Sequence, residues 1–291
     1  MKSATAAATR EAFKAALAGD DLVVAPGVYD GISVHAVERA GCHAAYMTGA
    51  GTAATYGYPD YGLITMSEMV ANAARLVAAT DLPVIADADT GYGNELNVVR
   101  TVQEYERAGV AAIHLEDQGF PKKCGHLEDK EIIPLDAFVK KIRAAVDTRV
   151  DPNFVIIART DSRAPIGFDE AVQRSNAALE AGADIAFLEA PQTMEEFKQV
   201  PKLVKGPCLI NMVWRGKSPE VKLAEAQAMG FKLAILPGLL IKAAVGAFDE
   251  ALAAMHQAGA HPKPRHDMSL REMFDKVGGT AWDGVRKRYG A

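Results

Sequence analysis

The chain has 291 residues, of which 49% are hydrophobic and 24% charged, a composition typical of folded globular proteins rather than disordered ones. Its 32 Lys and Arg against 37 Asp and Glu give a formal net charge of -5, and like charges form no long run, so nothing favours a nucleic-acid partner. The sequence has neither the apolar core of a signal peptide nor about 18 uninterrupted apolar residues, so we expect no association with a membrane.

Apolar runs of strand length alternate with longer segments of helical period along most of the chain. We predict eight strands, at residues 22–28, 43–48, 83–88, 111–116, 154–160, 184–189, 207–213 and 232–236. Most are apolar throughout their middle, as parallel strands covered on both faces are. Eight βα units of this size predict an α/β protein with a closed (β/α)₈ TIM-type barrel. A doubly wound open sheet is the alternative.

Two connections are longer than the others, at residues 50–66 and 118–134, and their Gly and Pro residues suggest loops that cover a site. Residues 257–266 are rich in Pro and His and are interpreted as a linker. Apolar residues then recur at roughly helical spacing. We therefore divide the chain into a barrel domain, 1–256, and a C-terminal helical appendage, 257–291, which needs an apolar partner on a neighbouring subunit or on its own barrel wall.

Polar side chains stand at the C-terminal ends of most predicted strands, where barrel enzymes build their active sites. Burying so many charges without partners would be costly, so we expect them to face a ligand, a metal ion or each other. They are Asp30, Thr48, Asp87, Asp89, His114, Glu116, Arg159, Asp161, Glu189 and Asn211.

Two carboxylates lie two residues apart at the end of the third strand, in the segment Asp87-Ala88-Asp89-Thr90-Gly91. Residues at this spacing share a face of a strand. With Asp60 and Glu116 they provide the oxygen ligands that suit Mg²⁺ or Mn²⁺. The alternative is that the two aspartates cap the next helix or pair with Arg159.

The loop after the fourth strand contains the segment Lys122-Lys123-Cys124-Gly125-His126. A thiol beside two lysines and a histidine lies in a positive field that stabilises its thiolate, so Cys124 is a candidate reactive cysteine, unless it is a bystander. Cys42 and Cys208 begin strands among apolar residues and are interpreted as packing residues. Three widely spaced cysteines argue against a disulfide framework, and we expect a cytoplasmic protein.

Arg159 ends an apolar strand and is the best candidate for bidentate binding of a carboxylate, with an ion pair to Glu189 or Asp161 as the alternative. The turn Thr48-Gly49-Ala50-Gly51 offers a hydroxyl and backbone N–H groups to an anionic ligand. Glycine-rich turns are common after barrel strands for geometric reasons alone, so this second signal is weak.

Over residues 20–250 the chain resembles the isocitrate lyase and phosphoenolpyruvate mutase superfamily. The motifs that carry the resemblance are Pro26-Gly27-Val28-Tyr29-Asp30, Tyr46-Met47-Thr48-Gly49, Tyr58-Pro59-Asp60, Asp87-Ala88-Asp89-Thr90-Gly91-Tyr92-Gly93, His114-Leu115-Glu116-Asp117-Gln118, the Lys122 to His126 segment, Ala158-Arg159-Thr160-Asp161 and Leu188-Glu189-Ala190. The resemblance implies a barrel that binds Mg²⁺, commonly as a homotetramer whose C-terminal helices are exchanged between paired subunits.

The resemblance also implies roles for individual residues. Asp87 and Asp89 would hold the metal, with Asp60 and Glu116 in its water shell. Cys124 would be the general acid of a C–C lyase, in a catalytic loop that includes Lys122 and His126, because the branches that act on phosphonates generally lack this cysteine. The residues that would line the substrate pocket are Tyr46, Thr48, Gly49, Ala50, His114, Arg159, Glu189, Asn211 and Trp214.

The activity implied is Mg²⁺-dependent cleavage of a 2-hydroxy di- or tricarboxylate, of the 2-methylisocitrate or dimethylmalate type, into a 2-oxo acid and a carboxylate. Trp214 and Arg215 stand where many relatives have Glu and Gly, so the substrate could carry an altered apolar or anionic arm. Two alternatives remain open: a phosphonomutase of the carboxyphosphonoenolpyruvate or phosphoenolpyruvate type, and a catalytically silent binding or assembly subunit.

Overall fold

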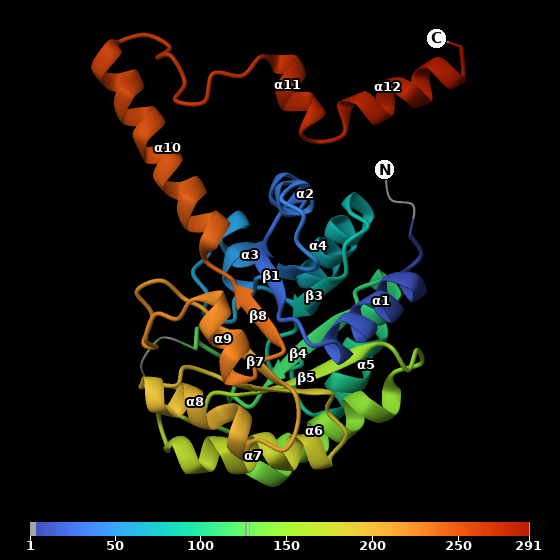
Figure 1. Ribbon diagram of the computed structural model, residues 1–291, viewed down its shortest axis with the longest axis vertical. Coiled ribbons are helices and arrows are strands. Elements are labelled where there is room, and N and C mark those ends of the chain that lie inside the picture. The colour runs from blue at the N-terminus through green and yellow to red at the C-terminus, as the bar shows by residue number, and fades with distance from the viewer. Residues whose placement is uncertain (1–3, 126, 128, 291) are drawn as a thin grey trace.

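Eight parallel strands close into a barrel in the computed structural model, which describes residues 4–125, 127 and 129–290 (Figure 1). Each strand pairs with the next in sequence, and β8 pairs back on β1 with Val23 opposite Leu233 and Pro26 opposite Leu236. The closed barrel is therefore confirmed over the open sheet. The strands are β1 (Val23–Val28), β2 (Ala45–Met47), β3 (Val84–Asp87), β4 (Ala112–Glu116), β5 (Val155–Thr160), β6 (Ile185–Leu188), β7 (Cys208–Asn211) and β8 (Leu233–Leu236).

Strand residues alternate between the barrel interior and the surrounding helices, and both faces are apolar over most of each strand. In β4, Ile113 and Leu115 pack outward, whereas Ala112 belongs to the interior cluster that also contains Val155 and Ile185. Two residues further along an inward row, toward the C-terminal end of its strand, the side chains become polar. Because the strands are parallel and closed into a barrel, these polar residues meet at its C-terminal end, which we call the mouth.

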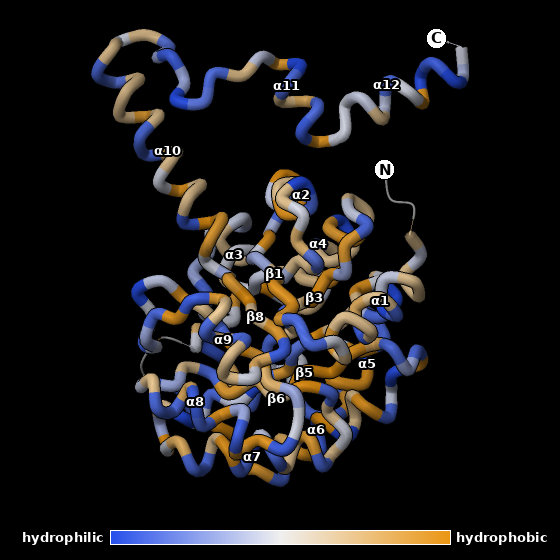
Figure 2. The backbone as a smooth tube through the Cα atoms, viewed as in Figure 1, coloured by the Kyte–Doolittle hydropathy of each residue, from blue (hydrophilic) through white to orange (hydrophobic). Residues whose placement is uncertain are grey.

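Helices surround the barrel, and their polar faces point outward in Figure 2. Side chains cap several of their N-termini, as where Asp30 accepts from Ser33 N and Asn94 from Asn97 N. The helices up to β8 are α1 (Ala6–Ala18), α2 (Gly31–Arg39), α3 (Gly49–Thr55), α4 (Met66–Ala79), α5 (Glu95–Ala108), α6 (Leu135–Thr148), α7 (Phe168–Glu180), α8 (Met194–Leu203) and α9 (Leu223–Met229).

Helix α3 corrects the expectation that residues 50–66 form a loop throughout. The Thr48 side chain accepts a hydrogen bond from Gly51 N, at 3.3 Å, and so starts a helix that runs to Thr55. The small residues Gly49, Ala50 and Gly51 fit this turn, because the helix packs tightly there: a Cβ added at Gly51 would overlap Thr48. Only the second part of the segment, from Tyr56 to Thr65, is irregular.

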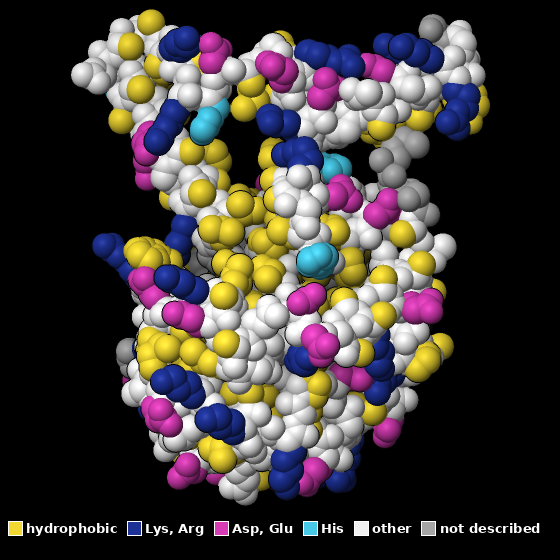
Figure 3. Space-filling view, in the orientation of Figure 1, with side chains coloured by type: hydrophobic (Ala, Val, Ile, Leu, Met, Phe, Trp, Pro, Cys, Tyr) yellow, Lys and Arg dark blue, Asp and Glu magenta, His cyan; other side chains and the backbone are white. Residues whose placement is uncertain are grey.

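Three helices follow β8: α10 (Leu239–Ala258), α11 (Leu270–Asp275) and α12 (Gly279–Arg288). Helix α10 contacts β1 and then leaves the barrel (Figure 1), and Arg39 of α2 donates to the Lys276 carbonyl at the end of α11. None of the described residues of these three helices is buried. Figure 3 shows hydrophobic side chains gathered over β1 and β8, beside the point where α10 leaves the barrel. The expected linker begins inside α10, which continues to Ala258. No helix in the described ranges combines the length and apolarity needed to cross a bilayer.

Candidate active site at the barrel mouth

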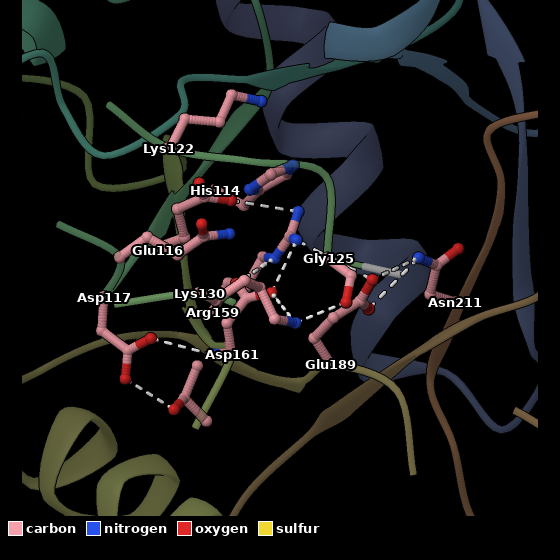
Figure 4. A network of polar contacts seen from close by, with 12 residues as sticks. His114, Glu116, Asp117, Lys122, Gly125, Lys130, Arg159, Asp161, Glu189 and Asn211 are labelled. Atoms are coloured by element: carbon pink, nitrogen blue, oxygen red, sulfur yellow. Dashed lines mark hydrogen bonds and ion pairs between the residues drawn. The ribbon is translucent and has the colours of Figure 1, made fainter. Parts of the chain in front are cut away.

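Inward-facing strand ends bring acidic, basic and aromatic side chains together at the C-terminal mouth of the barrel (Figure 4). Each continues the inward row of its strand, as Asp87 follows Ile85 and Arg159 follows Ile157. Asp87, His114, Glu116, Arg159 and Glu189 are all buried. The site therefore arises from strand register, and its charges must neutralise one another or a ligand.

Asp87 lies at the centre of a hydrogen-bonded group. Its Oδ2 accepts from the Tyr46 hydroxyl at 3.3 Å and from Gly49 N at 3.2 Å, and its Oδ1 accepts from Asp89 N at 2.9 Å. Burial opposes its ionisation, but nearby cations and the Asp89 N–H outweigh this and lower the pKa of Asp87 to about 2. Asp87 is therefore a carboxylate at neutral pH, held rigidly with its charge at the mouth.

Asp89 and Asp60 share the ammonium group of Lys122. The Lys122 Nζ lies 2.5 Å from Asp89 Oδ1 and 2.6 Å from Asp60 Oδ1, and the lysine is buried. Burial and the negative charges of Asp87 and Asp60 raise the pKa of Asp89 to about 6, although Lys122 acts in the opposite direction. Asp89 has a φ of 48°, so its backbone is held in a conformation that non-glycine residues rarely adopt.

The acidic group has the donors of a hard-cation site. Glu116 Oε2 and Asp89 Oδ1 are buried beside cations, with Arg159 Nη1 3.2 Å from the first and Lys122 Nζ 2.5 Å from the second, whereas the buried Oε1 of Glu116 forms no hydrogen bond among the described residues. Burial raises the pKa of Glu116 well above its usual range, although Arg159 and Lys122 act in the opposite direction. Mg²⁺ commonly binds through one or two carboxylates and retains several waters. Among the described residues, no group of three acidic, His or Cys side chains is arranged to hold a metal ion by itself. The arrangement therefore fits an ion that binds Asp87 and Asp89 and completes its coordination with water.

Arg159 has three carboxylate neighbours. Its Nε and Nη2 donate to Asp161 at 2.9 and 3.1 Å, its Nη1 lies 3.2 Å from Glu116, and its Nη2 lies 3.8 Å from Glu189. The guanidinium also stacks 5.2 Å above the Phe187 ring. Both ion pairs considered as alternatives to a ligand role are therefore present, and Nη1 and Nη2 still face the mouth toward Glu116 and Glu189.

The Cys124 loop, residues 118–134, lies against this cluster. Lys122 reaches Asp60 and Asp89, while a Cβ added at Gly125 would overlap the Arg159 guanidinium and the Glu189 carboxylate. Cys124 lies between these two anchors and is partly buried. The aspartate pair and the loop that bears Cys124 thus lie at one mouth. His126 lies outside the described residues.

The remaining predicted residues occupy several positions around the mouth. The His114 Nε2 lies 2.8 Å from the Tyr46 hydroxyl, and burial lowers the pKa of His114 to about 4, so the ring is neutral. Asn211 Nδ2 lies 3.2 Å from both oxygens of Glu189. Thr48 caps α3, whose Gly49 N–H binds Asp87 rather than facing an open anion nest, and Ala50 is exposed.

Trp214 is 63% exposed, on the connection after β7. It borders a cavity of about 670 Å³ that begins beside Asn211 and is otherwise mostly apolar. Lys242 Nζ donates to the Trp214 carbonyl at 2.8 Å and links this connection to α10. Trp214 therefore lies next to the mouth, on the side of Asn211.

Several site residues were missed from the sequence. Asp161 was considered only as an alternative partner of Arg159 and not as a site residue, yet it holds both Arg159 and Lys130. Phe187 supports Arg159 and meets His114 edge-on, with ring centroids 5.7 Å apart. Phe187 could have been predicted, because it lies in β6, two residues before Glu189, and therefore points to the same side of the strand. No periodic signal marks Lys130, because it lies in an irregular segment.

The chain matches the model of the phosphoenolpyruvate phosphomutase family over residues 13–256. It is 50% identical to 2,3-dimethylmalate lyase of Eubacterium barkeri over 86% of each chain, and 40% identical to 2-methylisocitrate lyase of Bacillus subtilis over 91% of this chain and 88% of that one. A solved structure of oxaloacetate acetylhydrolase with the inhibitor 3,3-difluorooxalacetate superposes with a TM-score of 0.94, at 36% identity and 98% coverage of both chains. The chain therefore belongs to the phosphoenolpyruvate mutase family of the isocitrate lyase/phosphoenolpyruvate mutase superfamily.

Proposed function

We propose that this chain is a Mg²⁺-dependent C–C lyase that cleaves a 2-hydroxy di- or tricarboxylate of the 2,3-dimethylmalate or 2-methylisocitrate type. The observation that carries the proposal is the position of the Cys124 loop. Its Lys122 touches Asp60 and Asp89, and its Gly125 packs on Arg159 and Glu189. A thiol and a carboxylate pair at one mouth are what such a cleavage requires, and the relatives named as lyases agree.

Asp87 and Asp89 would hold the divalent ion, with Asp60 and Glu116 in its water shell. When bound, the ion supplies Lewis-acid stabilisation for the hydroxyl and carboxylate oxygens that become the 2-oxo acid. Lyases of this superfamily depend generally on a divalent metal. The buried carboxylates of Asp87, Asp89 and Glu116 at one mouth supply the structural support for this assignment.

Arg159, together with the hydroxyl groups of Tyr46 and Thr48, would bind the 2-oxo acid unit of the substrate. A base takes the hydroxyl proton, the oxygen forms the new C=O bond, and the bond between the hydroxyl-bearing carbon and its neighbour breaks, with its electron pair left on the departing fragment as a carboxylate-stabilised carbanion. Cys124 Sγ gives its proton to that carbon.

An assay with purified protein tests the proposal. With Mg²⁺ and a panel of 2-hydroxy acids that includes 2,3-dimethylmalate and 2-methylisocitrate, we expect release of a 2-oxo acid, measured by coupled reduction, and loss of activity in EDTA that added Mg²⁺ restores. Turnover of phosphoenolpyruvate or a phosphonate without any turnover of hydroxy acids would contradict the lyase proposal.

Cleavage of oxaloacetate by water is a second candidate, favoured by the close superposition on oxaloacetate acetylhydrolase. In that reaction water attacks the oxo carbon, and the bond between this carbon and its CH₂ neighbour breaks. The substrate therefore needs no hydroxyl group. Oxaloacetate in the panel separates the two, because a hydrolase gives oxalate from oxaloacetate and leaves the 2-hydroxy acids unchanged.

We also propose that the C-terminal helices are exchanged between copies of the chain in a homotetramer. The described part of α10, α11 and α12 buries no residue, although Phe248, Phe274 and Trp282 are large apolar side chains exposed by half or more. An apolar helix face needs a partner, and the open apolar area over β1 and β8 in Figure 3 provides one on a second copy.

The double variant Phe274→Glu, Trp282→Glu is expected to form species of at most half the wild-type mass, because charged side chains cannot be buried in an apolar interface. Light scattering after size-exclusion chromatography measures the mass. Val150→Glu is the control: Val150 is also exposed and apolar, but it lies on the connection before β5. A monomeric wild type, or a double variant of unchanged mass, would contradict the exchange.

A further inference from the structure

Lys130 is a buried lysine that none of the roles above uses. Its side chain is 1% exposed, its Nζ lies 3.0 Å from Asp161 Oδ1, and the same Nζ donates a hydrogen bond to the Gly125 carbonyl. Gly125 directly follows Cys124 in the chain. One ammonium group therefore joins the Cys124 loop to the end of β5 (Figure 4).

The charge of Asp161 alone does not account for Lys130. The Asp161 carboxylate already receives two hydrogen bonds from Arg159, and the Asp161 N–H donates to Asp117 at 2.8 Å. The Arg159 guanidinium is shared with Glu116 and Glu189, so Lys130 adds positive charge beside Asp161, but that pairing leaves its second contact unexplained. Lysine is almost never fully buried unless it is paired. That second contact is the hydrogen bond from Lys130 Nζ to the Gly125 carbonyl.

The position of Gly125 makes that contact consequential. The glycine packs so closely on Arg159 and Glu189 that a side chain there would overlap both. On the other side of Cys124, the Lys123 backbone is fixed by Gln118, which accepts from Lys123 N at 2.9 Å and donates to its carbonyl at 2.8 Å. Cys124 is therefore held from both sides, and Lys130 supplies the hold on the side of Arg159.

We propose that Lys130 is a positioning residue that seats Cys124 at the mouth, by tying the Gly125 carbonyl to the Asp161–Arg159 pair. Its effect on turnover rests on the proposed lyase function, whereas its effect on the position of the thiol does not. An error of about 1 Å in the position of a reacting group can cost on the order of 10²-fold in rate. Loss of Lys130 should therefore impair the proton transfer step more than substrate binding.

The first experiment measures alkylation of Cys124 by iodoacetamide, followed by mass spectrometry of the peptide that contains it, and needs no substrate. Lys130→Met is expected to raise the alkylation rate about tenfold, because the released loop exposes the thiol, and Lys130→Arg is expected to restore most of the wild-type rate. Lys14→Met is the matched control, since Lys14 also joins a backbone carbonyl, of Pro152, to an aspartate, Asp184, but at the opposite end of the barrel. We expect the control to alkylate at the wild-type rate.

The second experiment compares kinetics on the best hydroxy acid, where Lys130→Met is expected to lower kcat by about 10- to 100-fold with KM changed less than threefold. If Lys130→Met does not fold, as judged by circular dichroism, Lys130→Gln carries both experiments with the same expected direction. An alkylation rate within twofold of wild type in the folded variant overturns the proposal. If the wild type cleaves no hydroxy acid, the lyase function fails, and the alkylation result still decides the role of Lys130.

Discussion

Replacing Asp87 with Asn is expected to abolish most of the activity, with kcat/KM lowered by roughly 10³-fold or more. Removal of a group that merely orients a metal ligand typically costs about 10- to 100-fold, and Asp87 is the proposed ligand itself. Asp87 also accepts hydrogen bonds from Gly49 N on one oxygen and from Asp89 N on the other. In Asn the amide nitrogen takes the place of one of these oxygens and cannot accept a hydrogen bond. The low pKa of Asp87, about 2, means that the wild-type charge is present throughout the neutral range.

The measurement for Asp87→Asn is a Mg²⁺ titration by calorimetry together with initial rates at saturating metal. The change should appear in both, as weaker Mg²⁺ binding and as lost turnover. Asp136→Asn is the control, because Asp136 is an exposed aspartate at the start of α6 that pairs with Lys140. If Asp87→Asn binds Mg²⁺ with wild-type affinity, Asp87 is not a ligand of the metal ion.

Replacing Cys124 with Ser is expected to lower kcat by about 10²- to 10⁴-fold, the range typical for loss of a general acid. A serine hydroxyl has nearly the size of the thiol but is a far weaker acid, so it donates its proton poorly to a carbanion. Binding of Mg²⁺ and of oxalate, an analogue of the 2-oxo acid product, should remain within about threefold of wild type, because the proposed ligands of both are intact.

Single-turnover kinetics and calorimetry with oxalate distinguish a chemical defect in Cys124→Ser from a binding defect. Cys42→Ser is the matched control, since Cys42 is a partly buried cysteine before β2, on the outside of the barrel. Full turnover by Cys124→Ser would assign the proton to another donor, and the Lys122 and Gly125 contacts would then describe only a cover over the mouth.

The barrel was predictable because each strand carries its own signal. A short apolar run followed by a polar inward residue marks the strand and its C-terminal end at once, and all eight strands were found within a few residues. Helix α3 was missed because Gly49, Ala50 and Gly51 are typical of a turn, and the cap from Thr48 that starts the helix is visible only in three dimensions. The exposure of α10 to α12 likewise depends on where α10 leaves β8, which no local pattern specifies.

The strand-end residues of the site were predictable for the same reason, but their partners were not. Arg159 was expected to pair with Asp161 or Glu189, and the structure adds Glu116. Lys122 was expected to act beside Cys124, yet its ammonium lies between Asp60 and Asp89, 62 and 33 residues away in the chain. Contacts of this kind depend on the path of an irregular loop, and the sequence contains no periodic signal for such a path.

The strict alternation of inward and outward residues also limits how this barrel can change over evolutionary time. A one-residue insertion early in β5 would turn Arg159 out among the surrounding helices and point an apolar neighbour at the mouth. The pocket therefore fixes the number of residues in each strand, whereas the loop that follows a strand is not fixed in this way. New specificities are accordingly easier to reach by exchanging inward side chains or by lengthening connections, such as the one that bears Trp214.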